Sequence, residues 1–347
     1  MKTVTVKTGR KYNIYIEKGL ISKCAELIKP ICQAEKVAVI TDSNVSALYL
    51  QKVTDSLRFD GYDVYSYVFP AGEASKNLGT INGMYNFLAE NRFSRKDLIA
   101  ALGGGVTGDM AGFAAATYMR GIDFVQIPTS LLAQVDSSVG GKTGVDLPQG
   151  KNLIGSFYQP IAVFIDPDTL KTLPERFRHD GMAEVIKYGC IKDRRLFEFL
   201  EDNEAFENIE KIIHRCVSIK RDVVALDERE SGERMLLNFG HTFGHAIEKL
   251  NNYTEITHGE AVAIGMVMMA KICEKLEICP PGTADRIALL CIKNDLPTST
   301  PLSFREIAHA CLNDKKATAN SINLVLLSKI GESFVQKTPS EDIFGLM

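Results

Sequence analysis

The sequence predicts an α/β domain followed by an all-helical domain, and three observations lead to this fold class. Short apolar segments alternate with amphipathic ones over roughly residues 37–166, a pattern typical of parallel strands joined by helical crossovers. Beyond Asp168 this pattern gives way to long stretches of helical periodicity. The 347 residues are also enough for two domains with separate cores. We therefore predict a doubly wound, mostly parallel sheet domain over residues 1–168 and an all-helical domain over residues 169–347.

The strands expected in the first domain are short, apolar and bounded by turn residues. Around Gly9, segments 4–6 and 12–16 are expected to form an antiparallel hairpin that joins the sheet. The parallel strands are expected at 37–42, 62–69, 98–102, 124–127 and 162–166, with helices reaching Leu57 and covering about 77–91.

The second domain is expected to contain amphipathic helices at 195–203, 209–227, 242–250, 260–276 and 283–294. Open α/β sheets bind ligands above the carboxyl ends of their strands. An active site is therefore expected in the cleft between the two domains.

Composition narrows the class of protein. Apolar residues make up 45% and charged residues 24%, as in soluble globular proteins, and the net charge of −3 gives no reason to expect a nucleic acid or an acidic membrane as partner. No apolar segment resembles a signal peptide or a membrane span, so we expect a cytoplasmic protein. Eight scattered cysteines without a C-x-x-C pair indicate reduced thiols, not disulfides or a thiolate zinc site.

Three of the six histidines lie close together in the sequence. His241 and His245 are one helical turn apart, and His258 precedes an apolar helical segment that a short loop could fold back toward them. Local packing explains a histidine pair as readily as a metal does, and the zincin pattern fails because Thr242 follows His241. The third imidazole favours a divalent metal of the zinc type.

A carboxylate for such a metal is available in segment 181–189. Glu184 and Lys187 are spaced i, i+3, which ordinarily indicates a surface ion pair. The flanking residues are apolar, however, and a buried carboxylate needs a cation or a metal as partner. Glu184, His241 and His258 would make an open three-ligand set.

Glycine-rich loops follow several of the predicted strands. Gly103, Gly105 and Gly108 satisfy G-x-G-x-x-G and open a helix, which suits a pyrophosphate, although a tight turn explains them equally well. Asp42 ends an earlier strand and could bind a ribose or cap a helix. Loops 70–76 and 136–144 and the segment Gly150–Lys151–Asn152 add lysines, which commonly hold phosphate but are also ordinary surface residues.

Taken together, these motifs resemble the 3-dehydroquinate synthase family over nearly the whole chain. The order and spacing of five segments carry the resemblance: GGGVTGD at 103–109, QVDSSVGGKTG at 134–144, GKNLIG at 150–155, LNFGHTFGHAIE at 237–248 and HGEAVAIGM at 258–266.

The resemblance implies a cyclase of the shikimate pathway. It would convert 3-deoxy-D-arabino-heptulosonate 7-phosphate into 3-dehydroquinate and phosphate. The implied sequence is transient oxidation by NAD+, phosphate elimination, re-reduction, ring opening and aldol closure. A homodimer is implied as well.

The resemblance also assigns residues. It makes Glu184, His241 and His258 ligands of Zn²⁺ or Co²⁺, and His245 and Glu230 acid/base groups. The substrate residues would be Lys142, Asn152, Arg120 (from across a dimer interface), Asp136, Lys187, Lys220, Arg234, Asn238 and either Lys315 or Lys316. The NAD site would comprise Asp42, Asn44, Glu73, Lys76, Gly104, Gly105, Asp109, Thr129, Ser130, Lys142, Lys151, Thr169 and Thr172.

Two segments depart from the family pattern. Ser130 stands where a second threonine is usual, which keeps a hydroxyl, and Asp146–Leu147 replaces the commoner Asn-His. The rival interpretations are a metal-dependent NAD polyol or alcohol dehydrogenase, another sugar-phosphate cyclase and a non-catalytic NAD-binding protein. A dehydrogenase would not need the residues that hold a phosphate group. Another sugar-phosphate cyclase should differ from this chain in segment 136–142. A non-catalytic NAD-binding protein should lack the metal ligands or the acid/base groups.

Overall fold

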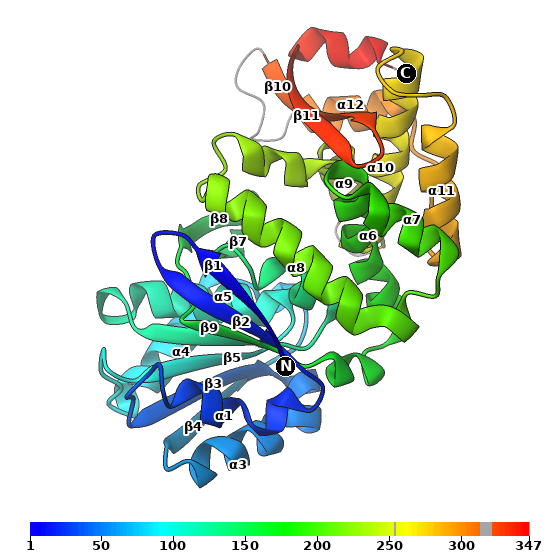
Figure 1. The fold of residues 1–347 in the computed structure, drawn as a ribbon. Helices are drawn as coiled ribbons and strands as arrows, with labels where there is room; N and C mark the ends of the chain where they lie inside the picture. The colour runs from blue at the N-terminus through cyan, green and yellow to red at the C-terminus, as the bar shows by residue number, and fades with distance from the viewer. Residues whose placement is uncertain (253–254, 313–320, 347) are drawn as a thin grey trace. The chain divides into compact units, whose positions relative to one another are not determined.

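The computed structural model describes residues 1–252, 255–312 and 321–346 (Figure 1). The chain forms two compact units. The N-terminal unit comprises Met1–Leu173 and Lys220–Arg229, and the C-terminal unit comprises Pro174–Ile219 and Glu230–Met347. The chain passes from one unit to the other at Pro174, within helix α8 (Ile209–Leu226) and after Arg229.

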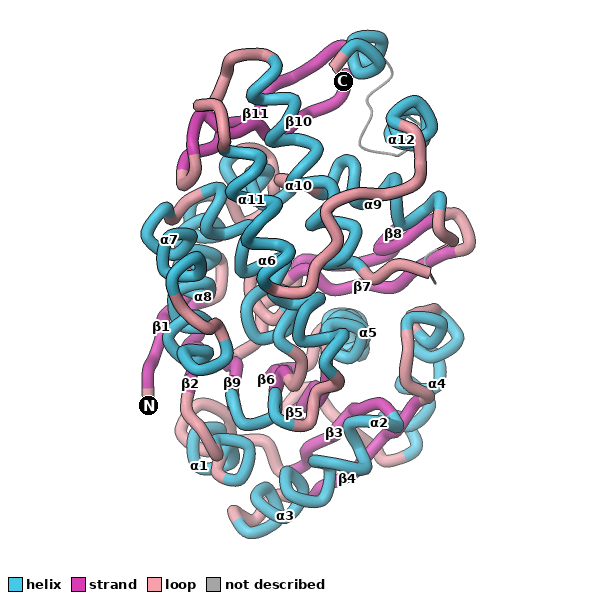
Figure 2. Tube along the Cα trace, turned by 90° about the vertical axis from the view of Figure 1, so that its right-hand side faces the viewer, coloured by secondary structure: helices cyan, strands magenta, loops and turns pink. Residues whose placement is uncertain are grey.

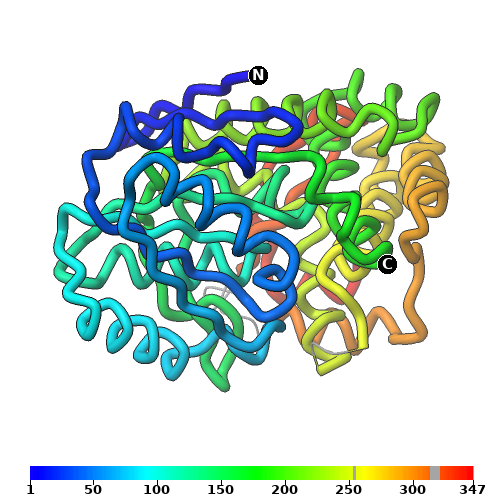
Figure 3. Tube along the Cα trace, turned by 90° about the horizontal axis from the view of Figure 1, so that it is seen from below, coloured from blue at the N-terminus to red at the C-terminus, as the bar shows by residue number. Residues whose placement is uncertain are grey.

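The N-terminal unit is built on a seven-stranded sheet, which confirms the predicted doubly wound fold. Its strand order in the described chain is β1-β2-β9-β6-β5-β3-β4. The parallel strands are β3 (Lys36–Asp42), β4 (Asp63–Phe69), β5 (Leu98–Gly103), β6 (Asp123–Pro128) and β9 (Ala162–Ile165). The hairpin of β1 (Lys2–Lys7) and β2 (Lys11–Ile16) is antiparallel and lies at one edge, where Figure 3 shows it in dark blue.

The central strands are buried on both faces, which is why they read as continuous apolar runs. Successive side chains of β5 point to opposite faces, so Leu98 and Ala100 join one apolar cluster while Ile99 and Ala101 join the other. The first cluster includes residues of α1 (Cys24–Ile28) and α3 (Gln51–Phe59), and the second includes residues of α4 (Leu78–Glu90) and α5 (Gly105–Thr117).

A second, two-stranded sheet in this unit was not predicted. β7 (Lys142–Leu147) and β8 (Gly150–Phe157) pair antiparallel in the segment that the sequence analysis treated as glycine-rich loops. A Cβ at Gly144 would lie 2.4 Å from the Ile154 carbonyl oxygen, and one at Gly155 would lie 2.2 Å from that of Thr143. These two glycines therefore permit close strand pairing.

The C-terminal unit is largely helical, as predicted. It contains α6 (Glu175–Ile191), α7 (Arg194–Asp202), the first part of α8, α9 (His241–Leu250), α10 (His258–Lys275), α11 (Thr283–Lys293) and α12 (Phe304–Leu312). Helix α10 is almost fully buried and packs against α6, α9 and α11 (Figure 2). A Cβ at Gly265 would lie 2.0 Å from the Gly240 carbonyl oxygen, so this glycine lets α10 approach the start of α9 closely.

The all-helical prediction needs one correction. Strands β10 (Ser321–Lys329) and β11 (Glu332–Pro339) form an antiparallel hairpin in this unit. Four consecutive buried residues in β10, Leu324 to Leu327, form an apolar run, and such a run cannot be told from a buried helix by periodicity. None of the described helices is both long and apolar enough to cross a membrane. All eight cysteines lie among the described residues and are buried, and none of them forms a disulfide.

Candidate functional site

The C-terminal unit brings together Glu184, His241 and His258. Glu184 Oε1 lies 3.3 Å from His241 Nε2 and 3.5 Å from His258 Nε2. In each of the three residues one ligand atom lies within 4.8 Å of the other two. The carboxylate and the two imidazoles that the sequence analysis selected therefore face one another.

Local structure places each of the three side chains. Glu184 lies in the buried half of α6, and His241 is the first residue of α9, after Gly240 with its left-handed φ of 77°. His258 is the first residue of α10, whose start is fixed by a capping box between Thr257 and Glu260. The Gly259 amide also donates to the Asp180 carboxylate of α6, one turn before Glu184. Helix α6 thus supplies one ligand and anchors the element that supplies another.

The charges around Glu184 are closely balanced. Its side chain is 1% exposed and forms an ion pair with Lys187, which is 2% exposed. Burial raises the pKa of Glu184, but Lys187 and His241 outweigh it and hold that pKa well below the ordinary value. Burial and Lys187 lower the pKa of His241. Burial also opposes a proton on His258, yet Glu184 and Glu248 raise the pKa of His258 to about 10. Glu184 and Glu248 thus place a carboxylate beside each ring nitrogen of His258, and this arrangement favours a positive charge there.

These residues fit a divalent metal. Among the described residues, neither Glu184 oxygen has a partner with good hydrogen-bond geometry, although both are buried. Two imidazole nitrogens and one carboxylate form an open three-ligand set of the kind that zinc enzymes use. A cation would satisfy the carboxylate oxygens, whose burial is otherwise costly.

Other predicted residues lie in the same unit. The ring of His245 is 5.4 Å from that of His241 and 5.9 Å from that of His258, measured between centroids. The Asn238 side-chain amide donates to Glu230 Oε1 at 2.8 Å, and Arg234, between them in sequence, is fully buried. Lys315 and Lys316 lie outside the described residues.

In the N-terminal unit, two strand ends meet at the point where the strand order reverses. β3 and β5 are parallel neighbours, and they end at Asp42 and Gly103. Asp42 caps the next helical turn, α2 (Ser43–Val45), accepting from Asn44 N at 2.8 Å. This is the N-cap alternative of the sequence analysis. The Thr107 hydroxyl lies 3.5 Å from the second Asp42 oxygen. Such a switch point is where open α/β sheets bind nucleotides.

The neighbouring predicted residues border the same edge of the sheet. Gly104 caps α5 and Gly105 is its first residue. The Thr129 amide donates to the Gly103 carbonyl oxygen at 2.9 Å, and an added Cβ at Gly104 would lie 3.3 Å from Ser130 Oγ. The Gln134 side chain donates to the Thr169 hydroxyl at 2.9 Å, and Tyr49 bonds to Thr172.

A buried lysine joins two of the predicted groups. Lys76 Nζ donates to Asp109 Oδ2 and to Asn152 Oδ1, both at 2.7 Å. Burial lowers the pKa of Lys76, but Asp109 and Glu73 outweigh burial and raise it, so the ammonium group keeps its charge. Glu73 Oε1 also lies 4.0 Å from Lys151 Nζ.

Asn152 is held from a second side. Its φ is 53°, and its backbone N–H donates to Asp146 Oδ1 at 2.7 Å. Asp146 was noted in the sequence only as a departure from a family pattern.

Of the remaining predicted residues, two pair with each other and two are exposed. Lys220 Nζ lies 2.9 Å from Asp136 Oδ1 and donates to the Asp136 carbonyl oxygen at 2.7 Å. Lys142 begins β7 and is exposed. Arg120 is exposed in a turn where its φ is 66°.

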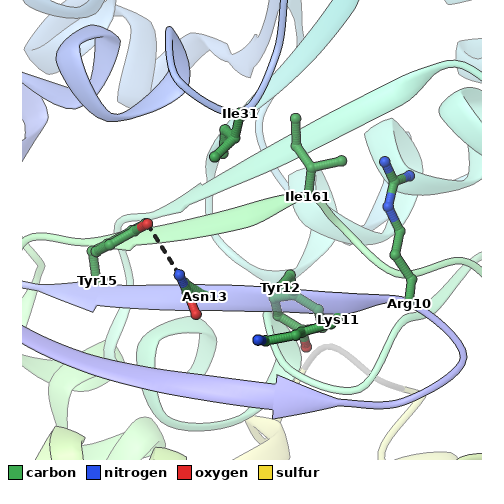
Figure 4. A pocket seen from close by; sticks show the side chains of 7 residues that line it. All are labelled: Arg10, Lys11, Tyr12, Asn13, Tyr15, Ile31 and Ile161. Carbon is green, nitrogen blue, oxygen red and sulfur yellow. Dashed lines mark hydrogen bonds between the residues drawn. The ribbon is translucent and has the colours of Figure 1, made fainter.

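A hollow of about 230 Å³ beside β2 contains none of these residues. It is lined by side chains of β2 with Arg10, Ile31 and Ile161, and Asn13 donates to the Tyr15 hydroxyl at 3.3 Å on its wall (Figure 4).

Comparison with known proteins identifies the family. The model of the 3-dehydroquinate synthase N-terminal domain matches residues 66–180, and that of the 3-dehydroquinate synthase C-terminal domain matches residues 181–317. The chain belongs to the 3-dehydroquinate synthase family. The 3-dehydroquinate synthase of Clostridium acetobutylicum is 51% identical over 350 residues, which cover 99% of this chain and 98% of that protein. The enzyme of Streptococcus thermophilus is 48% identical over 94% of both chains.

Solved structures of sister cyclases have the same fold. A 2-deoxy-scyllo-inosose synthase in complex with carbaglucose-6-phosphate, NAD+ and Co²⁺ is 28% identical, with a TM-score of 0.88 over 99% of both chains. The 2-epi-5-epi-valiolone synthase of Streptomyces hygroscopicus with NAD+ and Zn²⁺ bound is 25% identical, with a TM-score of 0.87 over 99% of this chain and 97% of that chain. Glycerol dehydrogenase of Schizosaccharomyces pombe, 19% identical with a TM-score of 0.62 over 88% of this chain and 85% of that chain, shares the fold alone.

Proposed function

We propose that this protein converts 3-deoxy-D-arabino-heptulosonate 7-phosphate into 3-dehydroquinate and phosphate. The observation that carries the proposal is the convergence of Glu184, His241 and His258 in a chain about half identical to 3-dehydroquinate synthases over nearly its whole length. That identity favours this reaction over those of the sister cyclases, which are 25–28% identical.

The proposed metal ligands are Glu184, His241 and His258. A bound Zn²⁺ or Co²⁺ ion would polarise substrate hydroxyl groups as a Lewis acid, and bound NAD+ would accept and return a hydride. Lys187 balances the Glu184 charge, and Glu248 contacts His258 on the side away from Glu184. The protein therefore supplies a preformed cradle for a cation.

The proposed NAD site lies at the carboxyl edge of the N-terminal sheet. The switch point between β3 and β5 and the start of α5 support it, because a helix N-terminus presents free backbone amides to phosphate. The residues that we assign to this site are Asp42, Asn44, Glu73, Lys76, Gly104, Gly105, Asp109, Thr129, Ser130, Lys142, Lys151, Thr169 and Thr172.

The proposed substrate residues divide between the two units. In the N-terminal unit they are Lys142, Asn152, Asp136, Lys220 and, from a partner subunit, Arg120. The Asn152 side chain is fixed by Lys76, which supports a binding role. In the C-terminal unit they are Lys187, Arg234, Asn238 and one of Lys315 and Lys316, with His245 and Glu230 as proton-transfer groups. The His245 ring stands beside the two imidazoles, where it could exchange a proton with a metal-held substrate.

We further propose a homodimeric, cytoplasmic enzyme that acts on a small phosphorylated sugar acid, without nucleic acid or membrane partners. The net charge of −3 gives no reason to expect a nucleic acid or an acidic membrane as partner.

The test is a phosphate-release assay. Purified protein, NAD+ and Zn²⁺ or Co²⁺ are mixed with the heptulosonate phosphate, and phosphate and NADH are followed together. Phosphate should be released over many turnovers without net NADH, because the hydride is returned. NADH formed in stoichiometric amount would favour a dehydrogenase. Phosphate released from glucose 6-phosphate but not from the heptulosonate phosphate would favour another cyclase.

A further inference from the structure

Glu248 is a buried acid that contacts a proposed metal ligand on the side away from Glu184. Its side chain is 2% exposed, and its Oε2 lies 3.2 Å from His258 Nδ1. The other ring nitrogen, Nε2, faces Glu184 at 3.5 Å. The His258 imidazole is therefore held between two carboxylates, one at each nitrogen.

We propose that Glu248 is a positioning residue for metal binding. It accepts the Nδ1–H of His258 and so keeps the Nε2 lone pair directed at the metal position beside Glu184. A ligating histidine usually donates its second N–H in this way, and the acceptor fixes the tautomer and the ring orientation. This inference rests on the metal site of the proposed function.

The two imidazoles obtain their second contact differently. His241 Nδ1 lies 3.1 Å from the Phe239 carbonyl oxygen, so the backbone sets its tautomer. For His258 the Glu248 side chain sets the tautomer, and a substitution of Glu248 can remove this contact. A carboxylate is also the stronger acceptor, because hydrogen bonds to ionised groups are shorter and roughly twice as strong as neutral ones.

Helix geometry brings Glu248 to His258. Glu248 lies seven residues after His241 and three after His245, so all three side chains project from one face of α9. The close packing of α9 on α10 through Gly265 then sets the first turn of α10 beside that face. An acid placed there has a free-energy cost of burial that its contact with His258 helps to offset.

A direct ligand role is the competing assignment, because His245, Glu248 and His258 also bring ligand atoms within 4.8 Å of one another. The two assignments differ in the effect of Glu248→Gln. The amide oxygen still accepts from Nδ1–H, whereas an amide is a poor replacement for a carboxylate ligand.

The experiment compares Co²⁺ binding by the wild type, Glu248→Ala, Glu248→Gln and a matched control, Glu260→Gln. His258→Ala serves as the reference for the loss of a ligand. Glu260 lies two residues after His258, and its carboxylate accepts hydrogen bonds from the Thr257 backbone amide and from Arg176. A glutamine at this capping-box position still accepts from Thr257, so Glu260→Gln should leave the start of α10 in place. Affinity is measured by chelator competition, and the visible spectrum of bound Co²⁺ reports its geometry. Glu248→Ala should weaken binding about 10- to 100-fold and change the spectrum. Glu248→Gln should weaken it less and keep the spectrum, and Glu260→Gln should bind like the wild type.

Several outcomes would overturn the inference. Wild-type affinity in Glu248→Ala would remove any role in metal binding. Loss of binding in Glu248→Gln as complete as in His258→Ala would make Glu248 a ligand. An equal loss in Glu260→Gln would show that the effect comes from the α10 start. If Glu248→Ala does not fold, Glu248→Gln is compared with Glu260→Gln and the wild type. Weaker Co²⁺ binding in Glu248→Gln alone, with the spectrum kept, would support the inference, and wild-type affinity would overturn it. A wild type that binds neither Co²⁺ nor Zn²⁺ would instead refute the proposed metal site, on which this inference rests.

Discussion

Glu184 combines near-complete burial with retention of its charge. Taking a lone carboxylate out of water is so costly that most such groups become protonated instead. Here Lys187 and the two imidazoles reverse that tendency, and the pKa of Glu184 stays well below its ordinary value. Removing one partner of a buried ionic cluster leaves an uncompensated charge. The cluster should therefore respond strongly to the loss of any single member.

His258 provides the test of this argument. His258→Ala should abolish metal retention, because two ligands remain and the Glu184 charge loses one of its contacts. NAD+ binding should persist, since the proposed nucleotide loops belong to the N-terminal unit. Metal content after gel filtration and NAD+ titration by calorimetry check both expectations. His179→Ala, which removes a histidine paired with Asp295, should retain the metal. Wild-type metal content in His258→Ala would contradict the ligand assignment.

Among the helices, α9 and α10 depend on a close backbone contact. His241 and His258 are the first residues of these two helices, so their separation depends on how closely the helices pack. Gly265 removes the side chain that would hold the helices apart, and Gly244 faces the backbone of Val262 in the same interface. The ligand geometry is therefore determined by helix packing and not by the histidines alone.

Gly265→Ala should disturb both stability and metal binding. Its Cβ would meet the Gly240 carbonyl oxygen at 2.0 Å, and overpacking of this kind typically costs about 1 to 3 kcal/mol. The shift of α10 should also weaken Co²⁺ binding. Urea unfolding and chelator competition measure the two effects. Gly345→Ala is the control, because nothing lies within 4 Å of its added Cβ. If Gly265→Ala were destabilised but bound Co²⁺ with unchanged affinity, the packing of α9 on α10 would not determine the ligand geometry.

At the scale of the whole molecule, the sequence predicted those features that repeat a simple pattern. β3, β5 and β9 were found because strands buried on both faces are apolar throughout. The helices of the C-terminal unit were found from their periodicity. The convergence of Glu184 with two histidines was predicted from residue type and from the resemblance. The domain boundary at residue 168 and the individual site roles stay predictions.

The features that were missed depend on tertiary contacts. The β7–β8 and β10–β11 hairpins lie in segments whose glycines or apolar runs fit more than one local structure. Glu248 had a signal in its spacing from His241 and His245, but only the fold shows that its carboxylate contacts His258. In the sequence, Asp146 is only a departure from the family pattern. The fold adds the hydrogen bond that Asp146 accepts from the Asn152 backbone N–H.

The proposed homodimer leads to a prediction about whole molecules. If Arg120 acts in the site of its partner subunit, Arg120→Ala and His258→Ala should each be inactive as pure proteins. A mixed dimer of the two would contain one site with His258 from one chain and Arg120 from the other. Random exchange yields mixed dimers as half of the population, so about one quarter of all sites should recover activity.

Subunit exchange under mild denaturation followed by the phosphate-release assay measures this recovery, and light scattering checks that the protein is a dimer. The control is a mixture of His258→Ala and Glu184→Ala chains. Each chain supplies all the proposed metal ligands of its own site, so every site in this mixture lacks a ligand and the mixture should stay inactive. If Arg120 served its own chain, the first mixture would also stay inactive, since each chain would carry a defect in its own site. Arg120 is exposed in the described chain, so its side chain is accessible to a second subunit.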